Sequence, residues 1–467
     1  MDKFFSRPAA VRARKFFEGP IYPVVVVLMM FIGHTAAIEY YMNFLNMALI
    51  TAALIFSESL KPLFAVVCTY LYQFSVKNSP SVPAQSDYFS DGGKIAAYVI
   101  LYIIVFAALV FFFRRNRIID RGELRRLPIL LPALLLSAAF LLNGVLGGAW
   151  SAASLGYGMM NILTFFIALY LFWLGFRRAD ADELASYFAY VSTLIALLIA
   201  AELGLLYLTS DSLIVDGAVN KEAVLLGWGN WNNIGQNMIV TIPAVFYGVM
   251  KNRNPWYYFA VATLTVGAAA LTLSRNALIF GALTYAACAI IACFVGRTRR
   301  AFRVITPAGA LSVVGVALVF REKIFSILAD YIERGMSDNG RFDLYKQGID
   351  EFLAAPIFGK GFFGITTETF NFVDFFPQMM HNTPIQLLAS MGIVGVLAYL
   401  VYRVATVRYV VRRPSLAKSM LAISMLVLIA QSLLDNFIFY IQPVLYYSVA
   451  FAIICRLDEK AVREERI

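Results

Sequence analysis

Histidine and cysteine are scarce in this chain. Only two of the 467 residues are histidine, His34 and His381, and they lie far apart with no carboxylate cluster beside either. This scarcity disfavours a catalytic zinc site, which needs three protein ligands. The four cysteines all fall within or at the ends of apolar segments, without metal-site spacing. Their placement disfavours a disulfide framework and is typical of packing residues.

Charge is also scarce, at 15% of residues, whereas hydrophobic residues make up 60% and the mean hydropathy is +0.72. No soluble domain of this length has such a composition, so the chain is predicted to cross a membrane many times. Its spans should be helical because no water satisfies backbone groups in lipid. We predict an all-α bundle forming one domain over residues 1–467, since no linker, repeat or low-complexity tract divides the chain.

About 20 apolar residues cross a hydrocarbon core about 30 Å thick. By this measure we predict fourteen spans, at 21–38, 41–56, 60–76, 95–113, 127–148, 159–176, 186–208, 234–250, 256–273, 277–295, 304–320, 385–402, 418–435 and 437–455. The second and third are short and separated only by SESLK, which leaves a re-entrant pair open.

The basic residues predict how these spans are oriented. Of the 39 lysines and arginines, 29 fall in the two termini and in alternate loops, which the positive-inside rule assigns to the cytoplasm. Both termini are therefore expected inside, with residues 1–20 as the inward flank of the first span because no signal cleavage site follows. The net charge of +10 is explained by inward loops beside anionic lipid, so no nucleic-acid partner is expected.

The same orientation puts the insertion at 321–384 outside. It is the one long polar stretch between two spans, and loops on a rigid scaffold often carry chemistry. Capping residue types at 337–339 and a stop at Pro356 predict an amphipathic helix between them. Its apolar residues follow helical spacing and should lie against the bundle: Phe342, Tyr345, Ile349, Phe352 and Leu353.

Arg341 falls in the first turn of this predicted helix, where the helix dipole disfavours a positive charge. The misfit favours a bound anion, because free N–H groups and a guanidinium together suit a phosphate. Asn339, at the cap, is then a candidate for substrate binding. The alternative is a solvent-facing arginine paired with Asp338 or Asp343.

Arg275 lies at the outer junction of the ninth and tenth spans, in LTLSRNALIF. A charge at the membrane boundary is costly, which makes this arginine a functional candidate. The alternative is an arginine that reaches the outer headgroups. The positive-inside rule disfavours an outward arginine, so we favour function.

His381 and Asn382 stand at the outer mouth of the twelfth span. A histidine there can act as a general base or hold an acceptor hydroxyl, and Asn382 is a candidate for substrate binding. The alternative is a histidine that only caps the helix. Asp435, near the outer end of the thirteenth span, is a further candidate substrate-binding carboxylate. Its alternative is a residue of the turn between two spans.

Two further patterns are weaker. The sequence GKGFFG at 359–364 matches a dinucleotide-binding fingerprint, but it follows a helix and lacks a βαβ context, so its glycines more plausibly permit a tight turn. The segment GWGNWNNIGQN at 227–237 places tryptophans at the outer interface, as an aromatic belt does. Its asparagines are candidates to line a sugar-binding surface.

Three segments in the order SRNALIF, NGRFDLYKQGIDEFLAAPIFGKGFFG and HNTPIQLLASMGIVGVLAYL resemble the O-antigen ligase and polymerase superfamily. The resemblance covers about residues 225–440, whereas the first 220 residues add only hydropathy. It implies a bacterial inner-membrane enzyme that takes a glycan from a polyprenyl diphosphate and moves it to an acceptor at the outer face. Tyr345 stands where many members have tryptophan, and ligase and polymerase both remain open.

The resemblance also implies residue roles. Arg275 and Arg341 would bind the diphosphate, His381 would lie near the acceptor, and Asp435 matches a late-span aspartate by position only. Stabilising charge on a leaving diphosphate needs no metal when two arginines supply it, so no metal or cofactor is expected. The expected partners are the lipid-linked donor, a glycan or lipid acceptor, the bilayer and other polysaccharide-assembly proteins.

Two rival interpretations come from other classes. A flippase for lipid-linked oligosaccharide, or another polytopic transporter, should show two related halves and unusual residues near mid-membrane. This chain shows no halves, and its unusual residues collect at the outer face. A membrane anchor for a partner complex would leave Arg275, Arg341 and His381 unexplained. We therefore favour the enzyme.

Overall fold

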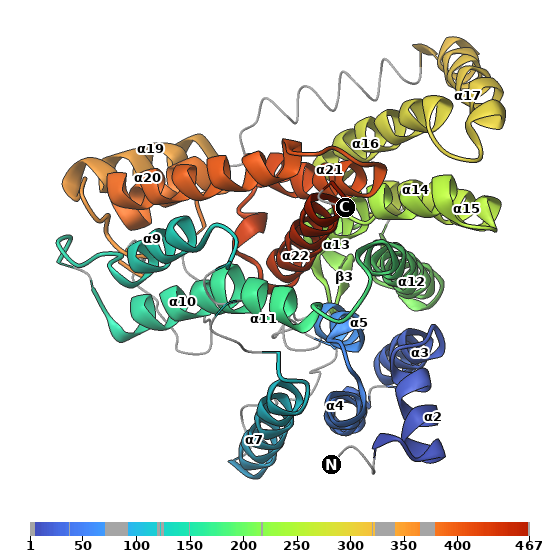
Figure 1. Cartoon of the computed structure of the whole chain (residues 1–467). Coiled ribbons are helices and arrows are strands. Elements are labelled where there is room, and N and C mark those ends of the chain that lie inside the picture. Colours follow the sequence, from blue (N-terminus) through green and yellow to red (C-terminus); the bar gives the residue numbers. More distant parts are fainter. Residues whose placement is uncertain are drawn as a thin grey trace.

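The computed structural model describes residues 5–36, 38–70, 92–118, 122, 126–148, 150–215, 218–319, 321–322, 341–364 and 379–465. Across these residues the predicted all-α class is confirmed: helices dominate, and the strands are only two residues long (Figure 1). One connected core of buried apolar side chains runs from Phe17 to Leu457.

The helices are these: α2 (Pro8–Phe17), α3 (Ile21–Thr35), α4 (Glu39–Phe56), α5 (Lys61–Tyr70), α7 (Gly92–Arg115), α9 (Leu130–Leu141), α10 (Ala152–Ile162), the π-helical η1 (Leu163–Ile167), α11 (Ala168–Gly175), α12 (Ala181–Thr209), the 3₁₀ helix η2 (Lys221–Ala223), α13 (Trp231–Ile239), α14 (Ile242–Lys251), α15 (Pro255–Leu271), α16 (Arg275–Phe294), α17 (Arg299–Val319), α19 (Arg341–Ala354), α20 (Thr383–Val411), α21 (Leu416–Gln431), the 3₁₀ helix η3 (Phe437–Phe439) and α22 (Ile441–Glu464). Two antiparallel hairpins pair β1 (Ile214–Val215) with β2 (Ala218–Val219) and β3 (Leu225–Leu226) with β4 (Gly229–Asn230).

Six helices in the described ranges are long and apolar enough to cross a membrane, or seven if the bent pair α2 and α3 is one span. Every predicted span overlaps a helix, but the count of fourteen is not confirmed. The predicted and observed numbers of spans differ because several helices are short. Helices α9, α15 and α21 have 12, 17 and 16 residues, and the predicted span at 234–250 is divided between α13 and α14. At 1.5 Å per residue, such helices are shorter than the hydrocarbon core.

Helix α22 lies at the centre of the bundle, beside α11, α12 and α21 (Figure 1). It begins just after the loop at 433–440 and runs 24 residues, or about 36 Å, to the far end. There Lys460 forms ion pairs with Asp180 and Asp182, at 2.9 and 2.6 Å. The loop at 433–440 and the segment around residue 180 therefore mark opposite ends of the bundle.

Helix α20 is kinked at Gly392, whose φ of 63° lies in the left-handed region. A Cβ atom there would lie 2.4 Å from the carbonyl oxygen of Ile357, so the close approach and the backbone angle both require glycine. The glycine-rich loop packs into this kink: the Lys360 and Gly361 N–H groups donate to Ala389 and Ser390 carbonyls, at 2.8 and 2.9 Å. The glycines of GKGFFG thus serve close backbone packing.

The predicted amphipathic helix forms as α19, described from Arg341 to Ala354, and it lies along α20 (Figure 1). The expectation that its apolar residues lie against the bundle is wrong for three of the five. Phe342, Ile349 and Leu353 are exposed, whereas the buried contact uses Gly348, which packs against Ile385. The contact face is therefore centred on Gly348 rather than on the predicted apolar stripe.

Candidate functional site

A cavity of about 580 Å³ lies where helices α13, α16 and α19 begin and where the chain enters α20. It is lined by Lys221, Asn230, Trp231, Asn232, Leu273, Arg275, Asn276, Ile279, Phe280, Arg341, Phe342, Leu344, Tyr345, His381, Leu434 and Asp435. Four of the six site residues predicted from the sequence therefore line one space, although they come from four separate segments. We call this space the glycan cavity, after the substrate that the sequence resemblance implies.

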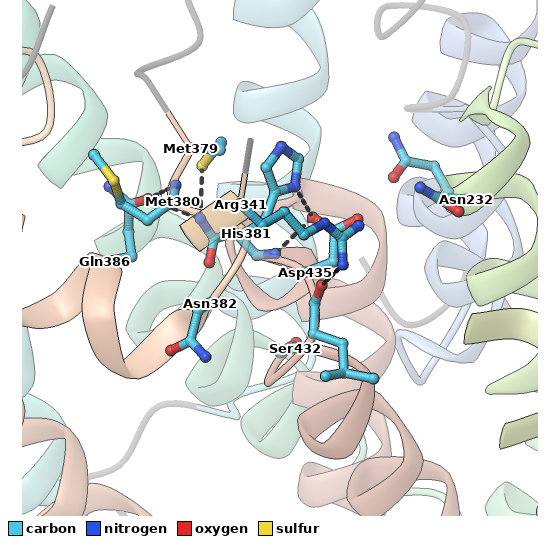
Figure 2. A network of polar contacts seen from close by, with 12 residues as sticks. Asn232, Arg341, Met379, Met380, His381, Asn382, Gln386, Ser432 and Asp435 are labelled. Atoms are coloured by element: carbon cyan, nitrogen blue, oxygen red, sulfur yellow. Dashed lines mark hydrogen bonds and ion pairs between the residues drawn. The ribbon is translucent and has the colours of Figure 1, made fainter. Parts of the chain in front are cut away.

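His381 and Asp435 form a pair in the glycan cavity. Nδ1 of the imidazole lies 3.0 Å from Oδ1 of the aspartate (Figure 2). The aspartate side chain is 6% exposed and the histidine 39%, so the carboxylate is shielded while the ring remains accessible. With Asp435 ionised, Nδ1 carries the proton and Nε2 keeps a lone pair. The arrangement is suited to general-base chemistry.

The helix start beside this pair is capped by another residue. Asn382 Oδ1 accepts from the Ile385 N–H at 3.1 Å, while its Nδ2 donates to the Leu433 carbonyl at 3.0 Å. Asn382 is not among the described residues that line the glycan cavity. The capping role considered for His381 is thus filled by Asn382, and His381 itself has a φ of 50°, a strained backbone conformation for a residue other than glycine.

A buried amide network holds the pair in place (Figure 2). Gln386 Oε1 accepts from the Met380 N–H at 2.8 Å and from Asn436 Nδ2 at 2.7 Å. The Asn436 N–H in turn donates to Asp435 Oδ1 at 2.8 Å. These bonds join the residues before α20 to the loop after α21, so the histidine and the aspartate keep their relative position.

Both predicted arginines line the glycan cavity. Arg275 is the first residue of α16, whose N-terminus lies at the cavity. Arg341 lies in α19 and donates from Nη1 to the Leu434 carbonyl at 3.2 Å. In the described part of the chain, Arg341 forms no ion pair with Asp343; Asp338 and Asn339 lie outside the described residues. Two guanidinium groups and the N-terminus of α16 together make this end of the cavity attractive to an anion.

The opposite wall is built by the hairpin β3–β4 and the start of α13. Asn230 caps α13 by accepting from the N–H groups of residues 232 and 233, at 3.0 and 3.2 Å. Asn232 accepts from the Ser274 hydroxyl at 2.8 Å, which ties α13 to the start of α16. Lys221 lies 5.4 Å from the centre of the Trp231 ring. This wall offers amides, a cation and an aromatic face.

Two residues that line the glycan cavity were not predicted from the sequence. Lys221 was not singled out, although it is one of the few basic residues in a segment assigned to the outside. Asn276 lines the cavity and has a buried side-chain oxygen without a hydrogen-bond partner among the described residues. Its position directly after Arg275 was the signal that could have drawn attention to it.

A second, smaller cavity of about 180 Å³ adjoins the same segments. Trp228, Asn233, Asn237, Met379 and Tyr440 are among its lining residues. Trp228 is buried and donates from Nε1 to Glu202 Oε2 at 2.9 Å. This bond holds the tryptophan within the fold, and its burial contradicts the interfacial role expected for it from the sequence.

Residues 259–400 match the family model described as O-antigen ligase. The matched segment runs from α15 into α20 and contains Arg275, Arg341 and His381, while Asp435 lies beyond it. No curated protein matches the chain. The match supports the resemblance found in the sequence: residues 259–400 of this chain are similar to the O-antigen ligase family.

Proposed function

We propose that this chain, with the O-antigen ligase domain as its core, transfers or polymerises a glycan carried on a polyprenyl diphosphate. The supporting observation is one cavity that combines anion-binding groups with an acid–base pair. Arg275 and Arg341 lie on its lining together with His381 and Asp435. A transferase of this kind needs both functions within reach of one sugar–diphosphate bond.

The donor diphosphate is assigned to the two arginines, with Lys221 adding a third positive charge. When the bond from the anomeric carbon to the diphosphate oxygen breaks, the electron pair and the negative charge remain on the diphosphate. Guanidinium groups stabilise this charge through bidentate, permanently charged contacts. The dipole of α16 adds to the same effect.

The acceptor hydroxyl is assigned to His381. Nε2 takes the hydroxyl proton as the acceptor oxygen attacks the anomeric carbon, and Asp435 stabilises the imidazolium that forms. The products are the extended glycan and the free polyprenyl diphosphate, with the proton on His381 until solvent removes it. Asn230, Trp231 and Asn232 are placed to contact sugar rings, through amide hydrogen bonds and aromatic packing.

The setting follows from the orientation expected from the sequence. We propose an inner-membrane protein with both termini in the cytoplasm and the glycan cavity at the outer face, organised as one domain. The transfer is proposed to need no metal or cofactor, and the partners are the lipid-linked donor, the acceptor and other polysaccharide-assembly proteins. The substrate-binding role expected for Asn339 remains a prediction; that of Asn382 is proposed only as support for the helix start.

The deciding experiment uses purified protein, lipid-linked glycan donor and acceptor in detergent with excess chelator. Asp435→Asn should reduce transfer roughly 10²-fold or more, because an amide cannot hold the protonated Nδ1 or stabilise the imidazolium. Donor binding should be retained. The matched control is Glu222→Gln, an exposed carboxylate in the same outer segment that does not line the glycan cavity. Transfer by Asp435→Asn at the control level would contradict the proposed base, and loss of transfer on chelation would contradict metal independence.

The same reconstitution separates the rival functions. A ligase extends an acceptor lipid once, whereas a polymerase makes a ladder of donor-linked repeats, so product length distinguishes them. A flippase would move the donor across vesicles without forming any new glycosidic bond. Donor translocation without transfer would therefore reject the enzyme proposal altogether.

A further inference from the structure

A second large cavity, of about 610 Å³, lies away from the glycan cavity. It is lined by Phe5, Ala10, Arg14, Phe56, Glu58, Arg114, Arg115, Asn116, Arg117 and Arg178. We call it the arginine cavity. Its residues come from the N-terminal helix, the link between α4 and α5, the end of α7 and the end of α11, which are far apart in sequence.

The arginine cavity occupies the end of the bundle opposite the glycan cavity. Arg178 is two residues from Asp180, which pairs with Lys460 at the far end of α22. The glycan cavity includes Asp435, just before the near end of the same helix. The arginines of the arginine cavity all come from segments that the positive-inside rule assigned to the cytoplasmic side. They therefore lie together at one end of the bundle.

Three of the five arginines have structural roles. Arg14 pairs with Glu58, and Arg115 donates to the carbonyls of Ile55 and Ser57. Arg178 donates to Asn116, at 2.7 Å to the backbone oxygen and 3.2 Å to the side-chain oxygen. These bonds shape the cavity and fix its walls.

The other two arginines have no such role. Arg114 and Arg117 are exposed on the cavity lining and, within the described ranges, their side chains form no hydrogen bond or ion pair. Asn116 between them is buried at 3% exposure, and Arg117 has a φ of 47°. Two guanidinium groups without a polar partner among the described residues therefore line the same space, one of them on a residue with a strained backbone angle.

The charge balance points to an anion. Five arginines against one glutamate leave a net charge of four on the lining. Glu18, which accepts from the Glu58 and Ser59 N–H groups, adds one negative charge nearby. The C-termini of α2, α7 and α11 contribute roughly −0.5 each, which still leaves more than one positive charge uncompensated. Like charges at this density repel one another, and a bound anion relieves the repulsion. A phosphate group meets this need because arginine binds it bidentately.

We propose that the arginine cavity binds a phosphate-bearing anion, held chiefly by Arg114 and Arg117. Phe5 and Phe56 supply an apolar flank beside the charged groups, which suits either a lipid headgroup with its glycerol portion or a soluble phosphate. This site is separate from the glycan cavity, and it does not depend on the proposed transfer reaction.

The test is a calorimetric titration of full-length protein in neutral detergent. The protein carries Arg275→Gln and Arg341→Gln, so that the glycan cavity does not contribute. The probes are dihexanoyl-phosphatidylglycerol, dihexanoyl-phosphatidylcholine and inorganic phosphate. We expect saturable binding of an anionic probe that weakens about tenfold or more with Arg114→Gln and Arg117→Gln together. Phosphatidylglycerol binding alone identifies a lipid headgroup, and binding of inorganic phosphate identifies a soluble phosphate.

The matched control is Arg299→Gln with Arg300→Gln, two exposed arginines at the start of α17 that do not line the arginine cavity. The control should bind as the parent does. Equal weakening in both double variants, equal affinity for both lipids, or no binding of any anionic probe would overturn the proposal. If the glutamine variant does not fold, Arg114→Lys with Arg117→Lys decides: it keeps the charge but loses the bidentate contact, and unchanged affinity would count against the site.

Discussion

The glycan cavity and the arginine cavity are of similar size, about 580 and 610 Å³, and arginines line both. They differ in where those arginines sit on their helices. Arg114 and Arg115 close the last turn of α7, where the helix dipole favours a positive charge. Arg275 begins α16, where the dipole disfavours a positive charge, and Arg341 lies in the first described turn of α19. A bound anion would relieve that unfavourable placement.

The cavities also differ in their one carboxylate. Glu58 pairs with Arg14 and so reduces the charge of the arginine cavity. Asp435 pairs with an imidazole, a group that can accept and release a proton. The arginine cavity therefore has groups for binding alone, whereas the glycan cavity has groups for binding and for proton transfer. Four predictions test this distinction.

The largest effect is expected from His381→Ala. Transfer should fall about 10²–10⁴-fold because the general base is lost, while donor binding is retained. His381→Gln should be nearly as impaired if proton transfer matters. The measurements are initial rates of glycan transfer and donor binding by the purified protein.

Asn382→Ala serves as the structural reference for that variant. It removes the cap of α20 and should cost about 1 kcal/mol of stability, measured by thermal unfolding in detergent. The contrary result is that His381→Ala loses the same amount of stability and retains near-normal transfer. The role of His381 would then be structural, and the glycan cavity would have binding groups only, like the arginine cavity.

Arg275→Lys and Arg341→Lys should each lower transfer about 10²-fold. Lysine keeps the charge but cannot reproduce a bidentate contact to the leaving diphosphate. The loss should appear in the turnover rate with the fold intact, as judged by thermal unfolding. Arg300→Lys, on the exposed start of α17, is the matched control. Equal activity of all three variants would remove the contrast between helix-start arginines and ordinary surface arginines.

Gly392→Ala should destabilise the protein by about 1–3 kcal/mol, since the left-handed φ and the contact with the Ile357 carbonyl both oppose a side chain. Because this kink holds the loop that follows α19, donor binding at the glycan cavity should weaken, whereas the arginine cavity should be unaffected. Gly309→Ala in α17, with no atom within 4 Å of its added Cβ, provides the reference for thermal unfolding. Equal melting of both variants would contradict the strain argument.

The smallest effect is expected from Glu58→Gln. Removing the one negative charge from the lining of the arginine cavity should strengthen phosphate binding about threefold. The effect is small because water and salt screen a surface charge. The calorimetric titration described above measures it. Weaker binding would mean that the ion pair between Glu58 and Arg14 is needed to hold the shape of the site. That loss would then outweigh the gain from removing the negative charge of Glu58.

Much of the architecture followed from local patterns in the sequence. Apolar segments predicted helices at every expected span, because lipid leaves the backbone no other choice. The existence of α19 and its end just before Pro356 were also anticipated from helical spacing and the proline stop, while the predicted capping residues at 337–339 lie outside the described residues. The number of crossings was not confirmed, since hydropathy does not reveal where a helix bends, breaks or stops short. The exposed face of α19 was missed because helical spacing cannot say which neighbour a stripe meets.

The sequence by itself determined the membrane class, the family resemblance and the candidates Arg275, Arg341 and His381. These are properties of composition and of residues close together along the chain. Only the tertiary structure decided that Asp435 meets His381 across 54 positions, and that arginines from the N-terminal helix, α7 and the end of α11 share one cavity. Contacts of that kind depend on how bent and broken helices pack, and side-chain packing is set by the whole bundle at once.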